Sequence, residues 1–575
     1  MLAEVVRRRA AHDGDRIAYT FLADGSVDAR SMSWSQLDRR ARALATALIQ
    51  RGAFGQPALL ALPSGLAFIE SLFGCWYAGA IALPVSLPRH QRVRHRLHGI
   101  VADAGARFAI GTLETRQRLN TDGIEHSLAG ELEWIDPDTA CDPPAGAAEP
   151  CVQQGDVALL QYTSGSTGAP RGVVVTHGNL MRNSALIAEA CGHGPGQTIA
   201  GWLPLFHDMG LIGLVLQAAY SGARCVFMSP ERFLMRPRLW LQMISDYGAC
   251  SSPAPNFAYD LCVDKVDHAQ KAGLDLSAWG NALNGSEPVR AATLERFASA
   301  FAGCGFQRRA FFPCYGLAEA TLFVTGPTEH RRTVRRSANG IELPDGDLNG
   351  HVGCGRTFGD TQLAIVDPIT AQRVPSGTTG EIWVAGESIA RGYWNNPDAT
   401  EATFNGRLKQ PITNRDDGLR WLRTGDMGFI AEGELFITGR LRELIIIAGR
   451  NHFPVDLERT AESADPAIAT SGAVAFSVDI DRSERLIIVA EVRREYGKPA
   501  ANRAQGDFDR EATRCRVRAA IAAEHEVAVH DVVLLCPGGV PRTTSGKISR
   551  RNTRDGYLGK TLERIADFAY EPVVP

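Results

Sequence analysis

The sequence lacks the cysteine patterns that mark metal-binding and redox proteins. Its twelve cysteines are scattered, and even the closest pairs, Cys141 with Cys151 and Cys304 with Cys314, are ten residues apart. No CxxC pair occurs, so zinc ribbons and thioredoxin-like redox sites are excluded. Thiols distributed in this way through a chain of 575 residues are typical of a reducing cytoplasm, where we expect the protein to act.

Long apolar runs and an excess of one charge are also absent. No window of about 18 uninterrupted apolar residues occurs, which argues against a transmembrane helix. The basic N-terminal stretch is not followed by the apolar run of a signal peptide. The 61 Lys and Arg residues nearly balance the 64 Asp and Glu residues. We therefore expect no transmembrane segment and no nucleic-acid partner, because binding to DNA or RNA depends on excess positive charge.

Apolar segments alternate between helix and strand patterns from the beginning of the chain. Residues 39–50 have helical spacing, residues 57–62 form a short apolar run typical of a strand, and residues 68–80 are again helical. This alternation predicts an α/β fold with layers of helices and parallel strands. The stretch DPPAGAAEP at residues 142–150 indicates a linker or turn.

The pattern changes after Gly353, where short strands with close turns predict a β-rich subdomain. A second boundary is expected near Arg440, because the strand and helix patterns beyond it fit a small α+β domain. We therefore predict a large N-terminal domain, residues 1–439, made of layered α/β subdomains and the β-rich part. Residues 440–575 would form the small C-terminal domain.

The clearest functional signal is a loop rich in glycine and hydroxyl side chains between two apolar strands. It reads QYTSGSTGAPRG, from Gln161 to Gly172. Such a loop exposes many N–H and O–H donors with little steric cover and can wrap phosphate oxygens. A plain Gly/Ser hairpin turn is the alternative. A Walker loop is excluded at the Gly546-Lys547 pair, because Pro541 stands where its first glycine should be.

The string YTSGSTGAPRG resembles the phosphate-loop signature of the adenylate-forming superfamily, which contains acyl-CoA synthetases, peptide-synthetase adenylation domains and luciferases. Matching motifs follow in the same order along nearly the whole chain. They are LPLFHDMGL (203–211), NGSEPV (284–289), YGLAEAT (315–321), GEIWVAGESIARGYW (380–394), RTGD (423–426), GRLRELIIIAGRNHFPVDLE (439–458) and PRTTSGKISR (541–550). HDMGLIG, YGLAEATLFV and IIIAGRNHFPVDLE look most like the fatty acyl-AMP ligase branch.

This resemblance implies a ligase that activates a fatty acid with ATP and Mg²⁺ to an acyl-adenylate, releasing pyrophosphate. It implies that the small domain is mobile and that the acyl group then passes to the phosphopantetheine thiol of an acyl carrier protein. A fatty acyl-CoA synthetase, an amino-acid-adenylating domain and a non-catalytic nucleotide-binding protein are the alternatives. The last is disfavoured because Glu319, Asp426, Arg440 and Lys547 are all present.

The resemblance also implies catalytic roles for single residues. Glu319 would hold Mg²⁺ through its carboxylate, since that ion prefers hard oxygen ligands. Lys547 would stabilise the charge that develops between the fatty acid carboxylate and the α-phosphate. Arg440 would support the ribose or the phosphates, and Arg442 would be the hinge between the domains. His207 would lie near the reacting carboxylate and the mouth of the acyl pocket.

Binding roles follow from the same motifs. Asp426 would accept hydrogen bonds from both ribose hydroxyls, because a carboxylate has two acceptor oxygens. Tyr315 would stack on the adenine, with residues 285–287 as the opposite wall. The residues expected to bind ATP or AMP are Thr163, Ser164, Gly165, Ser166, Thr167, Gly168, Arg171, Gly285, Ser286, Glu287, Tyr315, Gly316, Leu317, Ala318, Asp426 and Arg440. Those expected to contact the acyl group are His207, Asp208, Met209 and Gly210.

Some positions depart from the pattern of the superfamily. Arg171 stands where many relatives have lysine, but the positive charge is kept. The insertion that restrains the small domain in fatty acyl-AMP ligases would correspond to residues 326–350, and it is shorter than expected. A basic cluster in the last motif fits either docking of an acidic carrier protein or a solvated face. It consists of Arg542, Lys547, Arg550, Arg551 and Arg554.

Overall fold

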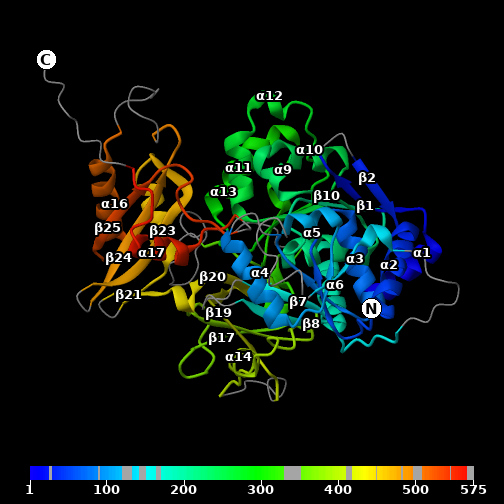
Figure 1. Cartoon of the computed structure of the whole chain (residues 1–575). Helices are drawn as coiled ribbons and strands as arrows, with labels where there is room; N and C mark the ends of the chain where they lie inside the picture. The colour runs from blue at the N-terminus through cyan, green and yellow to red at the C-terminus, as the bar shows by residue number, and fades with distance from the viewer. Residues whose placement is uncertain are drawn as a thin grey trace. The chain divides into compact units, whose positions relative to one another are not determined.

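The computed structural model describes residues 1–24, 29–87, 91–119, 132–140, 150–163, 170–328, 351–409, 418–447, 450–480, 483–496, 508–543 and 546–565. The chain divides into two compact units. The larger comprises Met1–Thr424 and Gly428–Ile437, and the smaller comprises Gly425–Met427 and Thr438–Pro575 (Figure 1). The predicted linker at residues 142–150 and insertion at residues 326–350 lie almost entirely outside the described residues.

The first sheet of the larger unit carries the predicted phosphate loop at its edge. Its described strands run in the order β6 (Glu133–Ile135), β5 (Phe108–Ile110), β3 (Pro57–Leu60), β4 (Ile81–Pro84), β7 (Val157–Thr163) and β8 (Arg171–Thr176). Neighbouring strands are parallel except for β7 and β8, which form an antiparallel pair. Strands β3, β4 and β5 are short and wholly apolar, which is typical of a parallel sheet buried on both faces.

The second sheet contains the strands that lead into two other motifs. Strand β12 ends at the start of NGSEPV, and β13 ends just before YGLAEAT. Its described order is β13 (Phe311–Pro313), β12 (Asn281–Asn284), β11 (Ser251–Ala254), β9 (Thr198–Gly201), β10 (Arg224–Met228), β1 (Ile17–Leu22) and β2 (Ala29–Ser33). Only the β1–β2 pair is antiparallel. The predicted layered α/β fold is therefore confirmed.

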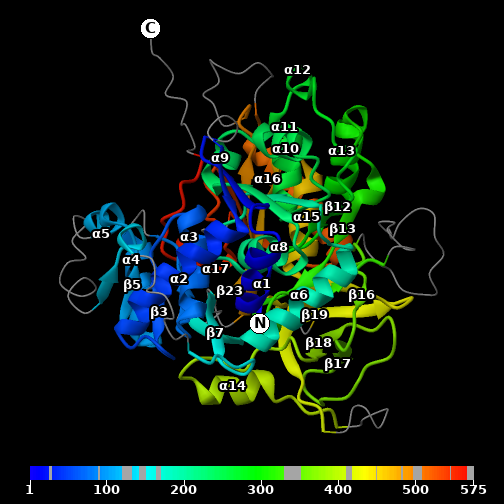
Figure 2. The same cartoon turned by 90° about the vertical axis from the view of Figure 1, so that its right-hand side faces the viewer.

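Helices between the strands cover both sheets. Helices α1 (Leu2–His12), α2 (Trp34–Gln50) and α3 (Leu66–Tyr77) lie side by side (Figures 1 and 2). Helix α6 (His177–Cys191) follows β8, and one buried apolar cluster joins residues of α2, α3 and α6 to both sheets. Helices α11 (Asn256–Lys265) and α13 (Ala291–Phe301) pack on each other over the second sheet.

The predicted β-rich part follows. Strands β14 (Tyr315–Gly316), β15 (Phe323–Gly326) and β16 (Arg356–Thr357) form a small antiparallel sheet. Strands β17 (Gln362–Val366), β18 (Gly380–Ala385), β19 (Leu422–Ala431) and β20 (Glu434–Arg440) form another, with α14 (Pro397–Phe404) nearby (Figures 1 and 2).

The smaller unit has the predicted α+β composition. A hairpin of β21 (Ile445–Ile447) and β22 (Arg450–His452) precedes α15 (Pro454–Ala464), whose first residue is a proline, a position where proline is favoured. Strands β23 (Ile468–Ile480), β24 (Ser483–Val492) and β25 (Val529–Leu535) form its main sheet. Helices α16 (Arg510–His525) and α17 (Arg550–Leu558) complete it. Among the described residues, no helix is long and apolar enough to cross a membrane.

The buried His177 at the start of α6 predicts how stability depends on pH. Its ring packs edge-on against Trp76, with centroids 5.6 Å apart, and burial lowers its pKa to about 4. Below the ordinary pKa of about 6.5 the unfolded chain takes up a proton that the folded protein excludes. Stability is therefore full above about pH 6.5 and falls as the pH decreases towards about 4.

We expect His177→Phe to remove this part of the acid sensitivity. Between about pH 7 and about pH 4, the wild type should lose up to about 3 kcal/mol more unfolding free energy than the variant. Urea denaturation at several pH values measures the difference, with each protein compared to its own stability near about pH 8. Parallel pH profiles for the two proteins would contradict the assignment.

Candidate functional site

The predicted phosphate loop is held by an antiparallel pair of strands. Thr163 at the end of β7 pairs with Arg171 at the start of β8, and Ser164, Gly165, Ser166, Thr167 and Gly168 lie outside the described residues. Just before the loop, the buried Gln161 donates from Nε2 to the carbonyl of Phe206 at 2.8 Å. This bond fixes the strand against the turn that carries His207.

The predicted acyl motif forms a compact turn. His207 precedes the short helix α7 (Asp208–Gly210), and its Nδ1 lies 2.6 Å from Oδ1 of Asp208. The amide of Met209 donates to the same carboxylate at 2.7 Å. A Cβ at Gly210 would overlap the carbonyl oxygen of Pro204, so the turn requires glycine.

A π-helix follows directly. Residues Leu211–Leu216 form this element, and most of their side chains are buried. The hydroxyl of Tyr19 on β1 donates to the carbonyl of Val215 at 3.0 Å. π-Helical turns are rare and occur often at functional sites. The chain therefore departs from regular α-helix immediately after the predicted acyl-binding residues.

Glu319 lies in a cluster that joins three motifs. It belongs to the 3₁₀-helix η6 (Ala318–Ala320), and its Oε1 accepts a 2.8 Å hydrogen bond from the hydroxyl of Tyr393. The guanidinium of Arg171 lies over the Tyr393 ring, 5.3 Å from its centroid. Burial and the nearby Glu319 carboxylate raise the pKa of Tyr393, so the hydroxyl remains a donor.

The segment that carries Tyr393 is bonded on two sides. Val174 donates to the carbonyl of Gly392 at 2.9 Å, and Trp394 donates to that of Gly172 at 2.7 Å, which adds the segment to β8. Ala390 donates to the carbonyl of Glu319 at 2.9 Å. Tyr393 belongs to the motif GEIWVAGESIARGYW, but its role could not be inferred from the sequence. A tyrosine in this motif was the only available signal.

The turn after Glu319 is strained. Thr321 has φ 70° and ψ −60°, and Leu322 donates to the carbonyl of Ala320 at 2.9 Å across it. This is the rarer, strained form of the γ-turn. The hydroxyl of Thr321 donates to the carbonyl of Ser388 at 2.6 Å, and a Cβ at Gly316 would overlap the carbonyl of Leu322. The surrounding contacts therefore impose the turn that presents Glu319.

The segment predicted to form the wall of the adenine site, residues 285–287, contacts the predicted acyl motif. Ser286 has φ 69°, unusual for a residue other than glycine, and its hydroxyl lies 3.3 Å from the sulfur of Met209. Glu287 accepts a 2.6 Å hydrogen bond from the amide of Phe257 at the start of α11. Tyr315 is largely buried on β14, and Gly316, Leu317 and Ala318 lead from it to Glu319.

The smaller unit carries the remaining predicted residues. The carboxylate of Asp426 on β19 lies 3.0 Å from Nε of Arg440 on β20. Arg442 lies in the 3₁₀-helix η8 (Leu441–Glu443). Lys547 closes a tight turn, in which Thr543 donates to its carbonyl at 2.6 Å and accepts from its amide at 3.1 Å.

One member of the predicted basic cluster does not lie on a solvated face. Arg550 forms ion pairs with Glu443 and with Glu458, the latter at 2.7 Å. Burial disfavours its charge, but the two carboxylates outweigh that effect and raise its pKa. The cluster was predicted either to dock an acidic carrier protein or to form a solvated face. Both predictions are wrong for Arg550, because its charge is paired inside the unit. Its partners precede it by 107 and 92 residues, which the sequence could not reveal.

A metal ion at this site would rely on few protein ligands. In the part of the chain that the structure describes, no group of three or more His, Cys, Asp or Glu side chains could hold one. Glu319 fits a cation such as Mg²⁺, which commonly takes one or two carboxylates and completes its shell with phosphate oxygens and water.

Comparison with known proteins places the chain among enzymes. Residues 6–394 match the family described as AMP-binding enzyme, and residues 442–567 match the AMP domain of Disco-interacting protein 2-like proteins. The chain is 39% identical to the medium-chain-fatty-acid–acyl-carrier-protein ligase JamA of Moorena producens, covering 98% of this chain and 96% of that protein. It is 34% identical to the long-chain-fatty-acid–AMP ligase FadD26 of Mycobacterium marinum, covering 98% of each.

A solved structure is also similar to this chain over nearly its whole length. The fatty acyl-adenylate ligase from Legionella pneumophila, in complex with acyl adenylate and pyrophosphate, superposes with a TM-score of 0.71. It is 34% identical, and the match covers 98% of this chain and 97% of that one.

The crowding around Gly316 gives a test of the site's architecture. Gly316→Ala should lower the unfolding free energy by about 1–3 kcal/mol, because the new methyl group must displace the backbone that ends the strained turn. Gly303→Ala is the matched control, since a Cβ there meets nothing within 4 Å. Its effect should stay within about 0.5 kcal/mol. Equal thermal or urea stability of the two variants would refute the steric requirement.

Proposed function

The chain is a fatty acyl-AMP ligase of the AMP-binding enzyme family, and we propose that it activates a fatty acid with ATP and passes the acyl group to an acyl carrier protein. The observation that carries the activation step is the cluster of Glu319, Tyr393 and Arg171. It places a carboxylate suited to a cation beside a positive charge at the end of the phosphate loop. The likeness to JamA over nearly the whole chain supports the acceptor.

ATP would bind along the motifs of both domains. The loop from Thr163 to Gly168 and Arg171 would hold the phosphates, while Tyr315 and the segment Gly285–Glu287 would enclose the adenine. Asp426 would hold the ribose, and its ion pair with Arg440 fixes the orientation of its carboxylate. Residues 1–439 would thus bind the acyl chain and most of the nucleotide, and residues 440–575 would carry Lys547.

Glu319 would hold Mg²⁺ together with phosphate oxygens of ATP. The ion would supply positive charge that offsets the charge of the phosphates. Tyr393 would keep Glu319 in place, because its hydroxyl satisfies one carboxylate oxygen and leaves the negative charge intact.

In the first step, a carboxylate oxygen of the fatty acid forms a bond to the α-phosphorus while the bond to pyrophosphate breaks. The products are acyl-adenylate and pyrophosphate. Both reactants are anions, so the site must supply positive charge and orientation. Lys547 would provide the charge between carboxylate and α-phosphate. His207, held by Asp208, would orient the fatty acid at the mouth of the acyl pocket.

In the second step, the deprotonated phosphopantetheine thiol attacks the acyl carbonyl carbon. The C–S bond forms, the C–O bond to AMP breaks, and AMP leaves with its phosphate oxygen negatively charged. Lys547 would have to withdraw to admit the thiol, so we propose that the small domain moves about Arg442, which lies in the short 3₁₀-helix after β20. Such a reaction with a carrier protein is expected in the cytoplasm.

A fatty acyl-CoA synthetase is the second candidate. It shares the first step and differs only in the acceptor. The residues that would decide between them, 326–350 and the turn at Gly449, lie largely outside the described residues. Experiment therefore has to separate the two.

Replacing Lys547 tests the first step. Lys547→Ala should lower acyl-adenylate formation by about 10²–10³ while leaving the fold intact, because one preorganised charge contact is lost from a partly exposed turn. Pyrophosphate release with ATP, Mg²⁺ and fatty acid measures the rate. Arg551→Ala removes an exposed positive charge four residues away and should keep the wild-type rate. Equal rates for Lys547→Ala and Arg551→Ala would remove the lysine from the mechanism.

The acceptor is tested by mass analysis of products. Wild-type protein with ATP, Mg²⁺ and a panel of fatty acids should accumulate acyl-adenylate. A phosphopantetheinylated carrier protein should then become acylated, whereas coenzyme A should yield little thioester. Acyl-CoA formed as fast as the adenylate would identify an acyl-CoA synthetase instead.

A further inference from the structure

We propose that Asn256, the first residue of α11, is a positioning residue that holds residues 284–290 in the shape needed for nucleotide binding. The inference rests on the proposed function, because that segment contains the wall of the adenine site. Asn256 is almost wholly buried and lies outside every motif of the resemblance.

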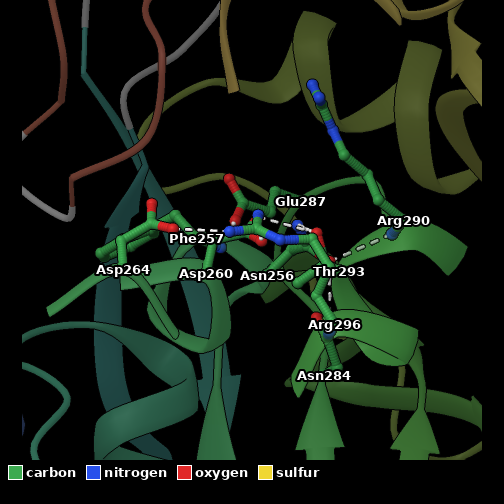
Figure 3. A network of polar contacts seen from close by, with 9 residues as sticks. All are labelled: Asn256, Phe257, Asp260, Asp264, Asn284, Glu287, Arg290, Thr293 and Arg296. Atoms are coloured by element: carbon green, nitrogen blue, oxygen red, sulfur yellow. Dashed lines mark hydrogen bonds and ion pairs between the residues drawn. The ribbon is translucent and has the colours of Figure 1, made fainter. Parts of the chain in front are cut away.

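Asn256 binds both ends of the segment with one atom. Its Oδ1 accepts from the backbone amide of Arg290 at 3.0 Å and from Nδ2 of Asn284 at 3.3 Å. Figure 3 shows the two contacts converging on the side chain. A single carbonyl oxygen thus sets the distance between the end of β12 and the beginning of α13.

The orientation of this amide is fixed from the other side. Nδ2 of Asn256 lies 3.0 Å from the hydroxyl of Thr293, and that hydroxyl lies 2.7 Å from Oδ2 of Asp260 (Figure 3). Burial raises the pKa of Asp260 to about 6, so at neutral pH it is ionised and can only accept. Thr293 therefore donates to Asp260 and accepts from Asn256. If the amide of Asn256 were flipped, its NH₂ group would face the backbone N–H of Arg290 and the NH₂ group of Asn284, so that donors would face donors.

Arg296 completes the network without touching the segment. It forms ion pairs with Asp260 at 2.8 Å and with Asp264 (Figure 3). Arg296 therefore stabilises the packing of α11 on α13, whereas Asn256 transmits that packing to both ends of residues 284–290. This difference provides a control residue.

The middle of the segment needs such support. Ser286 has the strained φ of 69° and contacts Met209 of the acyl motif. Glu287 is held by the amide of Phe257, the neighbour of Asn256. Helix α11 therefore fixes the segment at its two ends and at Glu287, and releasing the ends would let Ser286 relax away from Met209.

Two measurements on the full-length protein test the proposal. Asn256→Ala should weaken ATP binding by about tenfold, measured by calorimetry with Mg²⁺ and without fatty acid, because the wall is no longer preorganised. The peptide covering residues 284–290 should exchange its amide hydrogens faster. Arg296→Ala, which lowers thermal stability, should change both values much less than Asn256→Ala does, because Arg296 acts on Asn256 only through Asp260 and Thr293.

Thr293→Val is a second variant of similar volume that retains the Asn256 oxygen but frees the amide to flip. It should weaken ATP binding by about threefold and also speed exchange in residues 284–290. Unchanged ATP affinity in Asn256→Ala, or an equal loss in Arg296→Ala, would overturn the proposal. If Asn256→Ala does not fold, Thr293→Val decides by the same criteria. A wild-type protein that binds ATP but forms no acyl-adenylate would refute the proposed function and leave the role of Asn256 standing.

Discussion

The hydrogen bond from Tyr393 to Glu319 is the interaction around which the larger unit's motifs are arranged. The hydroxyl of Tyr393 donates to Glu319, and its ring lies under the guanidinium of Arg171. One tyrosine thus joins a carboxylate and a guanidinium that come from distant segments of the chain. The bonds from β8 and from Ala390 keep the tyrosine in this position.

The smaller unit uses its charges in the opposite way. Arg550, three residues after Lys547, is bound by two carboxylates from the preceding motif, so its charge is used inside the unit. A buried charge is costly unless it is fully paired, so this arrangement fixes the start of α17 against α15 and η8. The lysine turn is thereby attached to a rigid base.

Local sequence predicts local structure well in this chain. The apolar run at β3 and the strand–loop–strand setting of β7 and β8 were evident, because each depends on neighbouring residues. The family resemblance also placed Glu319, Asp426 and Lys547 in motifs. Tyr393, Asn256 and the partners of Arg550 could not be found in this way, since each acts on residues 28 or more positions away. Such contacts exist only once the elements have packed.

The π-helix after the acyl motif has a geometric consequence for everything that follows it. An α-helix turns by about 100° for each residue, so the extra residue in a π-turn rotates the succeeding side chains by that amount relative to an unbroken helix. The extra residue of the π-helix thus determines which face α8 (Gln217–Ser221) presents to α6. Within the π-helix, the carbonyl of Val215 accepts a hydrogen bond from the hydroxyl of Tyr19. The amide of Gln217 lies in the buried interior, where none of the described residues forms a hydrogen bond with its side chain. The irregular turn therefore sets the chemical character of the interior behind the acyl motif as well as its shape.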